Sequence, residues 1–225
     1  MLYFEVTRPV VNSFSSVLSR LSVFLGMETN HYEENDDFIQ NAATHVKQTA
    51  RNGRTEVFRD LVENDSRLNL GQEITCDALY KASKIGRYDV VKRLLDAKAP
   101  CDYNDRKSPL IVASRRGDLA MVKLLLDSGA SMTARNKRQY TALLAAAAWG
   151  RIDVLQLLID SNAPINDIER SGCTALHLAV KHGHIEVAQV LMEAGVDVNI
   201  RNKRGDTALL WSVCRDDVIT TDLLL

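Results

Sequence analysis

The chain has 225 residues, of which 46% are hydrophobic and 25% charged, the composition of an ordinary soluble protein with enough apolar material for a core. Its formal net charge of −1 points to neither nucleic acid nor a membrane surface as a partner. Only 4 Pro and 11 Gly argue against a linker-rich or low-complexity chain.

The cysteines, the lengths of the apolar runs and the N-terminus indicate the cellular compartment. None of the four cysteines belongs to a CxxC pair, and four are too few for a disulfide framework in a chain of this length. We therefore expect reduced thiols in a reducing compartment. No apolar run reaches the roughly 18 residues that span a bilayer, and the N-terminus lacks the pattern of a secretory signal. We expect a cytoplasmic protein, with the nucleus as the alternative.

Residues 1–35 predict a separate N-terminal segment. After Pro9, apolar residues follow one another at helical spacing and predict an amphipathic helix: Val10, Phe14, Val17, Leu18, Leu21 and Leu25. This helix has three possible roles. It caps the apolar end of the repeats that follow, it contacts a partner or a membrane, or it is an organelle-targeting segment rich in Arg and Ser.

From residue 36 the sequence repeats with a period of about 33 residues, which indicates a stacked array. The string Thr174–Ala179 has counterparts at Thr141–Ala146 and Thr207–Ser212. Three earlier counterparts begin at Ser108, Asp77 and, weakly, Thr44. A glycine stands nine residues after the first five of these starts: Gly53, Gly86, Gly117, Gly150 and Gly183. The pattern predicts six copies.

Each copy predicts two helices and an extended loop. Thr174 is placed to cap the first helix, Leu176 and Ala179 share one of its faces, and Gly183 ends it. Ile185, Val187, Ala188, Val190 and Leu191 supply the apolar face of a second helix, which Gly195 stops. Because one such pair cannot bury its apolar face alone, we expect the copies to stack into a continuous core.

The period, the glycine and the string TALHLAVKHGHIEVAQVLMEAGVDVN resemble the ankyrin repeat. The resemblance implies an all-α solenoid of stacked helix-turn-helix units with projecting β-hairpin-like loops over residues 36–225. It is strong for copies two to five. Copy one lacks core residues, and copy six ends at Leu225 inside its second helix. We therefore expect the chain to be a piece of a longer protein.

The sequence offers no catalytic centre, so we do not expect an enzyme. It contains no GxSxG, no glycine–lysine phosphate loop and no HExxH. His177, His182 and His184 lie close together in sequence, but the resemblance gives His177 and His184 the structural histidine positions of the repeat. We expect neither a metal site nor a cofactor. A solvated acidic stripe follows the second helices at one repeat position: Asp96, Asp127, Asp160 and Glu193.

In the ankyrin family, partners usually lie along the concave face and touch loop tips and first-helix ends. In copies three to six, half of those positions are basic and two are acidic, and the motif RNKR occurs there twice, at 135–138 and 201–204. The alternative is that these cations are solvated and that the aromatic residues are partly buried between copies. The expected partner-binding residues are Arg115, Arg116, Lys137, Arg138, Tyr140, Trp149, Arg170, Lys181, His182, Lys203 and Arg204.

These observations predict a monomeric adaptor or scaffold module that binds an acidic peptide or protein surface. One alternative is an anionic polymer, either nucleic acid or phosphoinositide, on the same groove. Another is that the chain is the targeting arm of an enzyme whose catalytic domain lies beyond Leu225. The resemblance also suggests a modification: Asn199, eight residues after Leu191, stands where ankyrin-like repeats can undergo asparagine hydroxylation.

Overall fold

The computed structural model describes residues 72–102, 107–215 and 217–225, all of which belong to one compact unit, residues 42–225. The predicted N-terminal helix, the boundary at residue 36 and copy one lie outside the described residues. Those described ranges contain helices and no strand, and the helices form five consecutive pairs: α4 (Gln72–Ile85) with α5 (Tyr88–Asp96), α6 (Pro109–Arg116) with α7 (Leu119–Asp127), α8 (Ala142–Ala148) with α9 (Ile152–Asp160), α10 (Ala175–His182) with α11 (Ile185–Glu193), and α12 (Ala208–Cys214) with α13 (Val218–Leu224).

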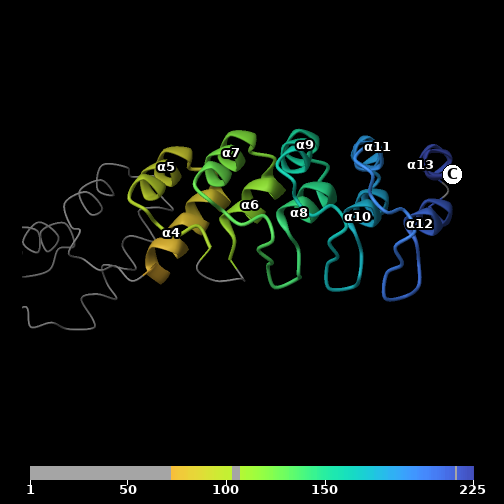
Figure 1. Cartoon of the computed structure of the whole chain (residues 1–225), viewed down its shortest axis with the longest axis horizontal. Helices are drawn as coiled ribbons and strands as arrows, with labels where there is room; N and C mark the ends of the chain where they lie inside the picture. Colours follow the sequence, from red (N-terminus) through yellow and green to blue (C-terminus); the bar gives the residue numbers. More distant parts are fainter. Residues whose placement is uncertain (1–71, 103–106, 216) are drawn as a thin grey trace, which may run out of the picture. The chain divides into compact units, whose positions relative to one another are not determined.

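The pairs stack side by side in chain order, as predicted (Figure 1). The first helices form one row, in which α4 packs on α6, α6 on α8, α8 on α10 and α10 on α12. The second helices form a row above them, and the loops between copies project on the other side (Figure 1). Within the described ranges, no helix is long and apolar enough to cross a bilayer.

The first helices begin where the sequence supplies a hydroxyl. The side-chain oxygens of Ser108, Thr141, Thr174 and Thr207 each accept a backbone N–H from three residues on, which satisfies one of the free donors of the first turn. At the other end Gly183 has φ 73°, so the predicted glycine stop is confirmed. Copy two differs, because α4 begins at Gln72, before Asp77. Asp77 lies inside the helix and pairs with Lys81 and Lys107 instead of capping it.

The core follows the predicted positions. Leu176 and Ala179 are buried, as are their counterparts Leu110, Ala113, Leu143 and Ala146 in the two preceding copies. In α11 the predicted face is buried at Val187, Ala188 and Leu191, while Ile185 and Val190 are half-buried. α8 lies between two neighbours and is buried along its whole length, which its Ala-rich sequence allows.

The projecting loops are tight hairpin-like turns. The Asn136 N–H donates to the carbonyl of Tyr140 at 3.1 Å, and the equivalent bond joins Asn202 to Asp206 at 2.9 Å. Neighbouring loops are joined to each other by backbone bonds, from the N–H of Arg170 to the Arg138 carbonyl at 3.2 Å and from Lys203 to the Ser171 carbonyl at 3.0 Å. The loops therefore form a continuous surface whose tips are held in register.

A second set of bonds joins the copies at the ends of the first helices. At each of the four junctions between described pairs, a side chain of the later copy donates to a carbonyl in the last turn of the earlier first helix. The bonds are Arg116 to Lys84 at 3.3 Å, Arg151 to Arg115 at 3.1 Å, His184 to Ala148 at 3.2 Å and Arg215 to Lys181 at 2.6 Å. Each satisfies a carbonyl that the helix leaves unpaired, and a cation there also complements the helix dipole.

Candidate partner-binding surface

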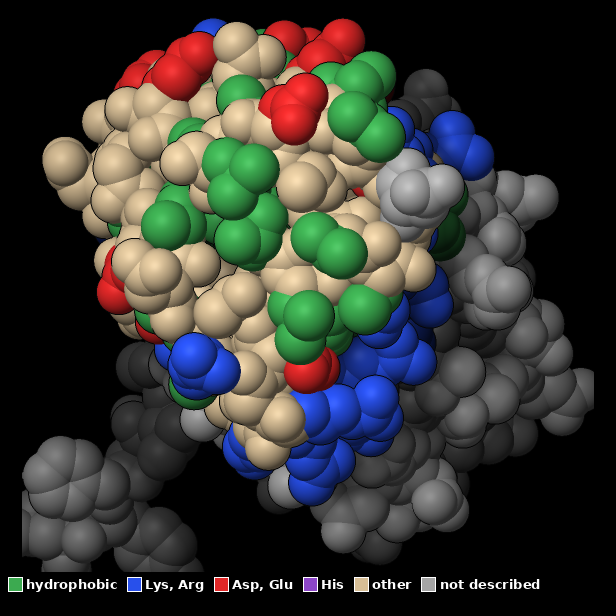
Figure 2. Space-filling model, turned by 90° about the vertical axis from the view of Figure 1, so that its right-hand side faces the viewer, with side chains coloured by type: hydrophobic (Ala, Val, Ile, Leu, Met, Phe, Trp, Pro, Cys, Tyr) green, Lys and Arg blue, Asp and Glu red, His purple; other side chains and the backbone are tan. Residues whose placement is uncertain are grey.

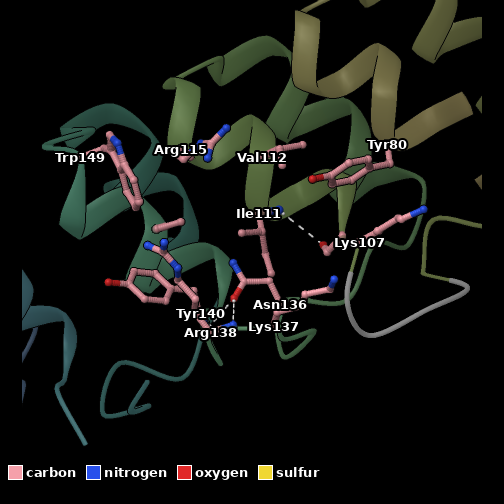
Figure 3. Close-up of a pocket in the computed structure, with 12 residues that line it drawn as sticks. Tyr80, Lys107, Ile111, Val112, Arg115, Asn136, Lys137, Arg138, Tyr140 and Trp149 are labelled. Carbon is pink, nitrogen blue, oxygen red and sulfur yellow. Dashed lines mark hydrogen bonds between the residues drawn. The ribbon is translucent and has the colours of Figure 1, made fainter. Parts of the chain in front are cut away.

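The loops and first helices enclose a groove of about 440 Å³, which we call the aromatic groove (Figure 3). Lys107, Asn136, Lys137, Arg138 and Tyr140 line it from the loops, and α4, α6 and α8 supply Tyr80, Ile111, Val112, Arg115 and Ala145, with Trp149 directly after α8. No second-helix residue lines it. The groove therefore lies where the sequence predicts a partner, between loop tips and first-helix ends.

Trp149 forms the aromatic corner of this groove with Tyr140 and Arg115. The Trp149 and Tyr140 rings meet edge to face, with centroids 6.1 Å apart, and the Arg115 guanidinium lies 5.7 Å from the Trp149 ring centre. Trp149 is nevertheless 41% exposed. Trp149 therefore packs against Arg115 of the preceding copy and still presents an indole surface to solvent, and its role as a binding anchor stays a prediction.

A second groove of about 620 Å³, which we call the cationic groove, lies at the last two described pairs. Its charged residues are Arg170, Lys181, Lys203, Arg204 and Arg215, and the others are Ser171, Cys173, Asn202, Trp211 and Cys214. The Lys181 ammonium lies 5.8 Å from the Trp211 ring centre. The Trp211 indole N–H donates to the Asp206 carboxylate at 3.2 Å, so its polar atom is already used within the repeat.

Charge is segregated on this molecule. Among the described residues, the two grooves are lined by four and five Lys or Arg residues and by no Asp or Glu. Among the groove cations, an ion pair within the described residues is recorded only for Lys107, with Asp77 at 2.6 Å. Figure 2 shows Lys and Arg gathered on the loop side and a group of carboxylates at the top, where the second helices lie, with single carboxylates elsewhere, one of them beside the basic patch. The predicted acidic stripe is exposed at the ends of those helices: Asp96, Asp127, Asp160 and Glu193.

The structure brings most of the predicted binding residues together and separates two from the grooves. Arg115, Lys137, Arg138, Tyr140 and Trp149 line the aromatic groove, and Arg170, Lys181, Lys203 and Arg204 line the cationic groove. Neither groove includes Arg116 or His182. Arg116 instead donates to the Lys84 carbonyl, and the His182 ring stacks on His184 at a centroid distance of 6.2 Å.

The two copies of RNKR divide into supporting and presented residues. Arg135 donates to the Ile168 carbonyl at 2.8 Å and pairs with Asp167 at 2.8 Å, while Arg201 donates to the Gly205 carbonyl at 3.0 Å. The Asn136 side-chain oxygen accepts the N–H groups of Arg138 and Tyr140 at 2.9 and 3.1 Å. The first two residues of the motif therefore hold the turn, and the Lys–Arg pair that follows is exposed at its tip.

Asn202 plays the same part in the second copy. It is buried, and its side-chain oxygen accepts the N–H groups of Arg204 and Asp206 at 2.8 and 3.0 Å. In the intervening loop Glu169 replaces the asparagine and accepts the Ser171 N–H at 2.9 Å. Sequence reasoning missed the two aromatic groove residues that lie inside first helices, Tyr80 and Trp211, which stand three and four residues after the starts of their copies.

The clustered histidines have structural roles. His177 completes a capping box with Thr174 and reaches the Asp206 carbonyl of the next copy at 3.1 Å, and His184 reaches back to Ala148 at 3.2 Å. The predicted contacts with neighbouring turns are therefore confirmed. Burial lowers the pKa of His177 below its ordinary value of 6.5. In the described part of the chain, no group of three or more metal-ligating side chains is gathered.

Asn199, the predicted modification site, is exposed on the loop after α11. Its backbone N–H donates to the Asp197 carboxylate at 2.9 Å, while Leu191 is buried in α11. The amide side chain is thus at the surface and the leucine in the core.

Comparison with known proteins agrees with this architecture. A family model described as ankyrin repeats (3 copies) matches residues 46–136 and 110–202, and one described as ankyrin repeats (many copies) matches residues 181–225. Ankyrin repeat and SOCS box protein 11 from Homo sapiens is 30% identical over 104 residues, which are 45% of this chain and 32% of that protein.

Two further relatives come from distant organisms. Putative ankyrin repeat protein FPV014 of fowlpox virus is 37% identical over 82 residues, 35% of this chain and 19% of its own length. Protein HOS4 of Saccharomyces cerevisiae is 32% identical over 103 residues, 42% of this chain and 10% of its own length. The chain thus spans a third or less of these curated relatives. Because the repeat models cover it from residue 46 to residue 225, the chain belongs to the ankyrin-repeat family.

Proposed function

We propose that this chain is a protein–protein interaction module of the adaptor or scaffold type, which binds an acidic segment of a partner protein along its loop side. The observation that carries the proposal is the lining of the two grooves, where the described residues include nine Lys or Arg and no carboxylate. A surface of one sign attracts a partner of the opposite sign and speeds its encounter.

The exposed aromatic corner supports a protein partner in particular. Trp and Arg are the residues most often found to anchor protein interfaces, and Trp149 lies beside Arg115 and Tyr140. The grooves also extend over several repeats, so a partner segment would contact loop tips held at fixed spacing. A rigid surface of this kind binds without ordering itself first, which lowers the entropic cost of association.

The test uses labelled synthetic peptides and fluorescence anisotropy. A Glu/Asp-rich peptide should bind, and a Lys-rich peptide of equal length should not. Reversing the four tip cations (Lys137→Glu, Arg138→Glu, Lys203→Glu and Arg204→Glu) should abolish binding. The matched control reverses two charges of the acidic stripe (Asp96→Lys and Asp127→Lys) and should leave affinity nearly unchanged.

Two outcomes would contradict the proposal. If the stripe reversal damages binding and the tip reversal does not, the partner lies on the second-helix side. If a single-stranded oligonucleotide binds more tightly than the acidic peptide, with the steep salt dependence of counterion release, the cations serve nucleic acid.

A further inference from the structure

The aromatic and cationic grooves are built on the same repeat positions but differ in character. Lys137 and Arg138 of the aromatic groove correspond to Lys203 and Arg204 of the cationic groove, 66 residues later, and Arg115 corresponds to Lys181. The grooves therefore lie two repeats apart on one side of the array. Their other lining residues differ, because the aromatic groove has three aromatic side chains and two branched aliphatic side chains, whereas Trp211 is the one aromatic residue among the described residues that line the cationic groove.

The aromatic groove suits an apolar side chain. Figure 3 shows Trp149 and Tyr140 at one end of it and Tyr80 at the other, with Ile111 and Val112 between them. The Trp149 indole N–H has no recorded bond to any described residue, and 41% of the residue is exposed. A hydrophobic side chain placed here removes this aromatic and aliphatic surface from water.

The cationic groove suits a group with more than one negative charge. Five Lys or Arg residues line it without a carboxylate, and no ion pair within the described residues is recorded for any of them. Three are arginines, namely Arg170, Arg204 and Arg215, and Arg215 also donates one N–H to the Lys181 carbonyl at 2.6 Å. One carboxylate offsets one of these charges, whereas a phosphorylated side chain carries about −1.5 to −2 and three acceptor oxygens. Arginine forks match phosphate oxygens particularly well.

We infer that the partner segment is an extended phosphopeptide, with an apolar side chain in the aromatic groove and a phosphorylated Ser or Thr in the cationic groove. This inference rests on the proposed function and specifies the chemistry of its ligand. The separation of the two grooves also sets the spacing of the ligand. Packed helices lie about 8–10 Å apart, so two repeats correspond to roughly 16–20 Å, or about five to six residues of extended chain at ~3.3 Å each.

The experiment measures the affinity of labelled synthetic peptides by anisotropy at fixed ionic strength. Each peptide carries one Phe and one phosphoserine, in either order, on a neutral Thr/Gln background, at a separation of three or six residues. The peptide with the six-residue separation should bind roughly tenfold tighter, or more, than the peptide with the three-residue separation. Replacing phosphoserine by Ser or Glu should weaken binding roughly tenfold or more, the usual worth of charged hydrogen bonds.

Variants of the protein assign each half of the peptide to its groove. Lys203→Gln with Arg204→Gln should remove the preference for phosphoserine and keep the preference for Phe over Gly. Trp149→Ala should remove the preference for Phe over Gly and keep the preference for phosphoserine. It should also lower the affinity for the peptide with the six-residue separation by about thirtyfold. Trp149→Phe is the matched control and should keep most of the affinity. Circular dichroism checks that each variant is folded.

The outcomes separate this inference from the proposed function. Equal binding of Glu and phosphoserine peptides would overturn the phosphate assignment, while acidic binding along the loop side would still stand. Equal binding at both separations would show that the grooves do not share one ligand. If none of these peptides responds to Lys203→Gln with Arg204→Gln while the Glu/Asp-rich peptide still loses binding on reversal of the four tip cations, only this inference is wrong; if that peptide does not respond either, the proposed function is wrong as well.

Discussion

His177 links copy five to copy six, and replacing it should destabilise the array measurably. It is 1% exposed, its Nδ1 accepts the Thr174 N–H at 3.3 Å, and its Nε2 donates to the Asp206 carbonyl at 3.1 Å. Its ring also meets Trp211 edge to face at 5.5 Å. An unsatisfied buried group costs about 1–3 kcal/mol and an aromatic contact contributes about 0.5–1.5 kcal/mol. We expect His177→Ala to lower the free energy of unfolding by about 2–4 kcal/mol in urea denaturation.

The same residue should make the array sensitive to acid. Burial lowers the pKa of His177 below 6.5, so the folded state binds fewer protons than the unfolded state. The stabilisation is therefore complete above about pH 6.5 and is lost as the pH falls from there toward the folded-state pKa. Protonation would also place an N–H on Nδ1, which faces the Thr174 N–H.

Urea denaturation of the wild type at pH 7.5, 6.5 and 5.5 measures this dependence. His177→Ala should flatten it. His182→Ala is the control for the second perturbed histidine, whose pKa is lowered by burial and by neighbouring positive charge, and it should keep the part of the slope due to His177. A free energy of unfolding that does not change between pH 7.5 and 5.5, or an equal slope in His177→Ala, would refute the reasoning.

Three further predictions test the array. Gly172→Ala should lower the free energy of unfolding by about 1–3 kcal/mol, because φ is +81° and a Cβ would lie 2.9 Å from the Lys203 nitrogen; Gly195→Ala, with φ +77° and no atom within 4 Å, should cost less. Hydrogen exchange should be slowest over residues 110–191, and uniform protection through Leu225 would contradict this. Mass spectrometry of endogenous protein should find hydroxylation on Asn199, and a wholly unmodified peptide would remove that proposal.

Periodicity predicted the helix pairs because the repeated positions are those that a helix pair must bury or cap. Thr174, Leu176 and Gly183 cap, fill the core and adopt a positive φ as their counterparts do in copies three and four, so a local pattern is sufficient to find them. The start of α4 was missed because Asp77 occupies a capping position in the alignment of copies, yet two lysines bind its carboxylate inside a longer helix.

The candidate site could be predicted only in part, because the hydrogen-bond acceptor of a basic side chain can lie in the preceding copy, where the sequence of its own repeat does not reveal it. Arg116, an expected binding residue, and Arg215, which lines the cationic groove, both donate to a first-helix carbonyl of the preceding copy. A pattern that marks the end of a first helix does not show which cations reach that carbonyl. Contacts between copies determine which side chain reaches the carbonyl. Arg151 and His184 make the same bond from a position two residues later in the repeat.

Within the four-residue motif RNKR, we expect the asparagine to contribute to stability and the Lys–Arg pair to contribute to binding. Asn202→Ala should lower the free energy of unfolding by about 1–2 kcal/mol, because the N–H groups of Arg204 and Asp206 lose their acceptor. Lys203→Gln with Arg204→Gln should change the free energy of unfolding by less than about 0.5 kcal/mol, since both side chains are exposed. The same double variant should lower the affinity for an anionic peptide. If the Lys–Arg pair proves as important for stability as the asparagine, its recurrence reflects folding alone. If stability and binding divide as expected, the repeat sets where the tip lies and the exposed pair determines what it binds.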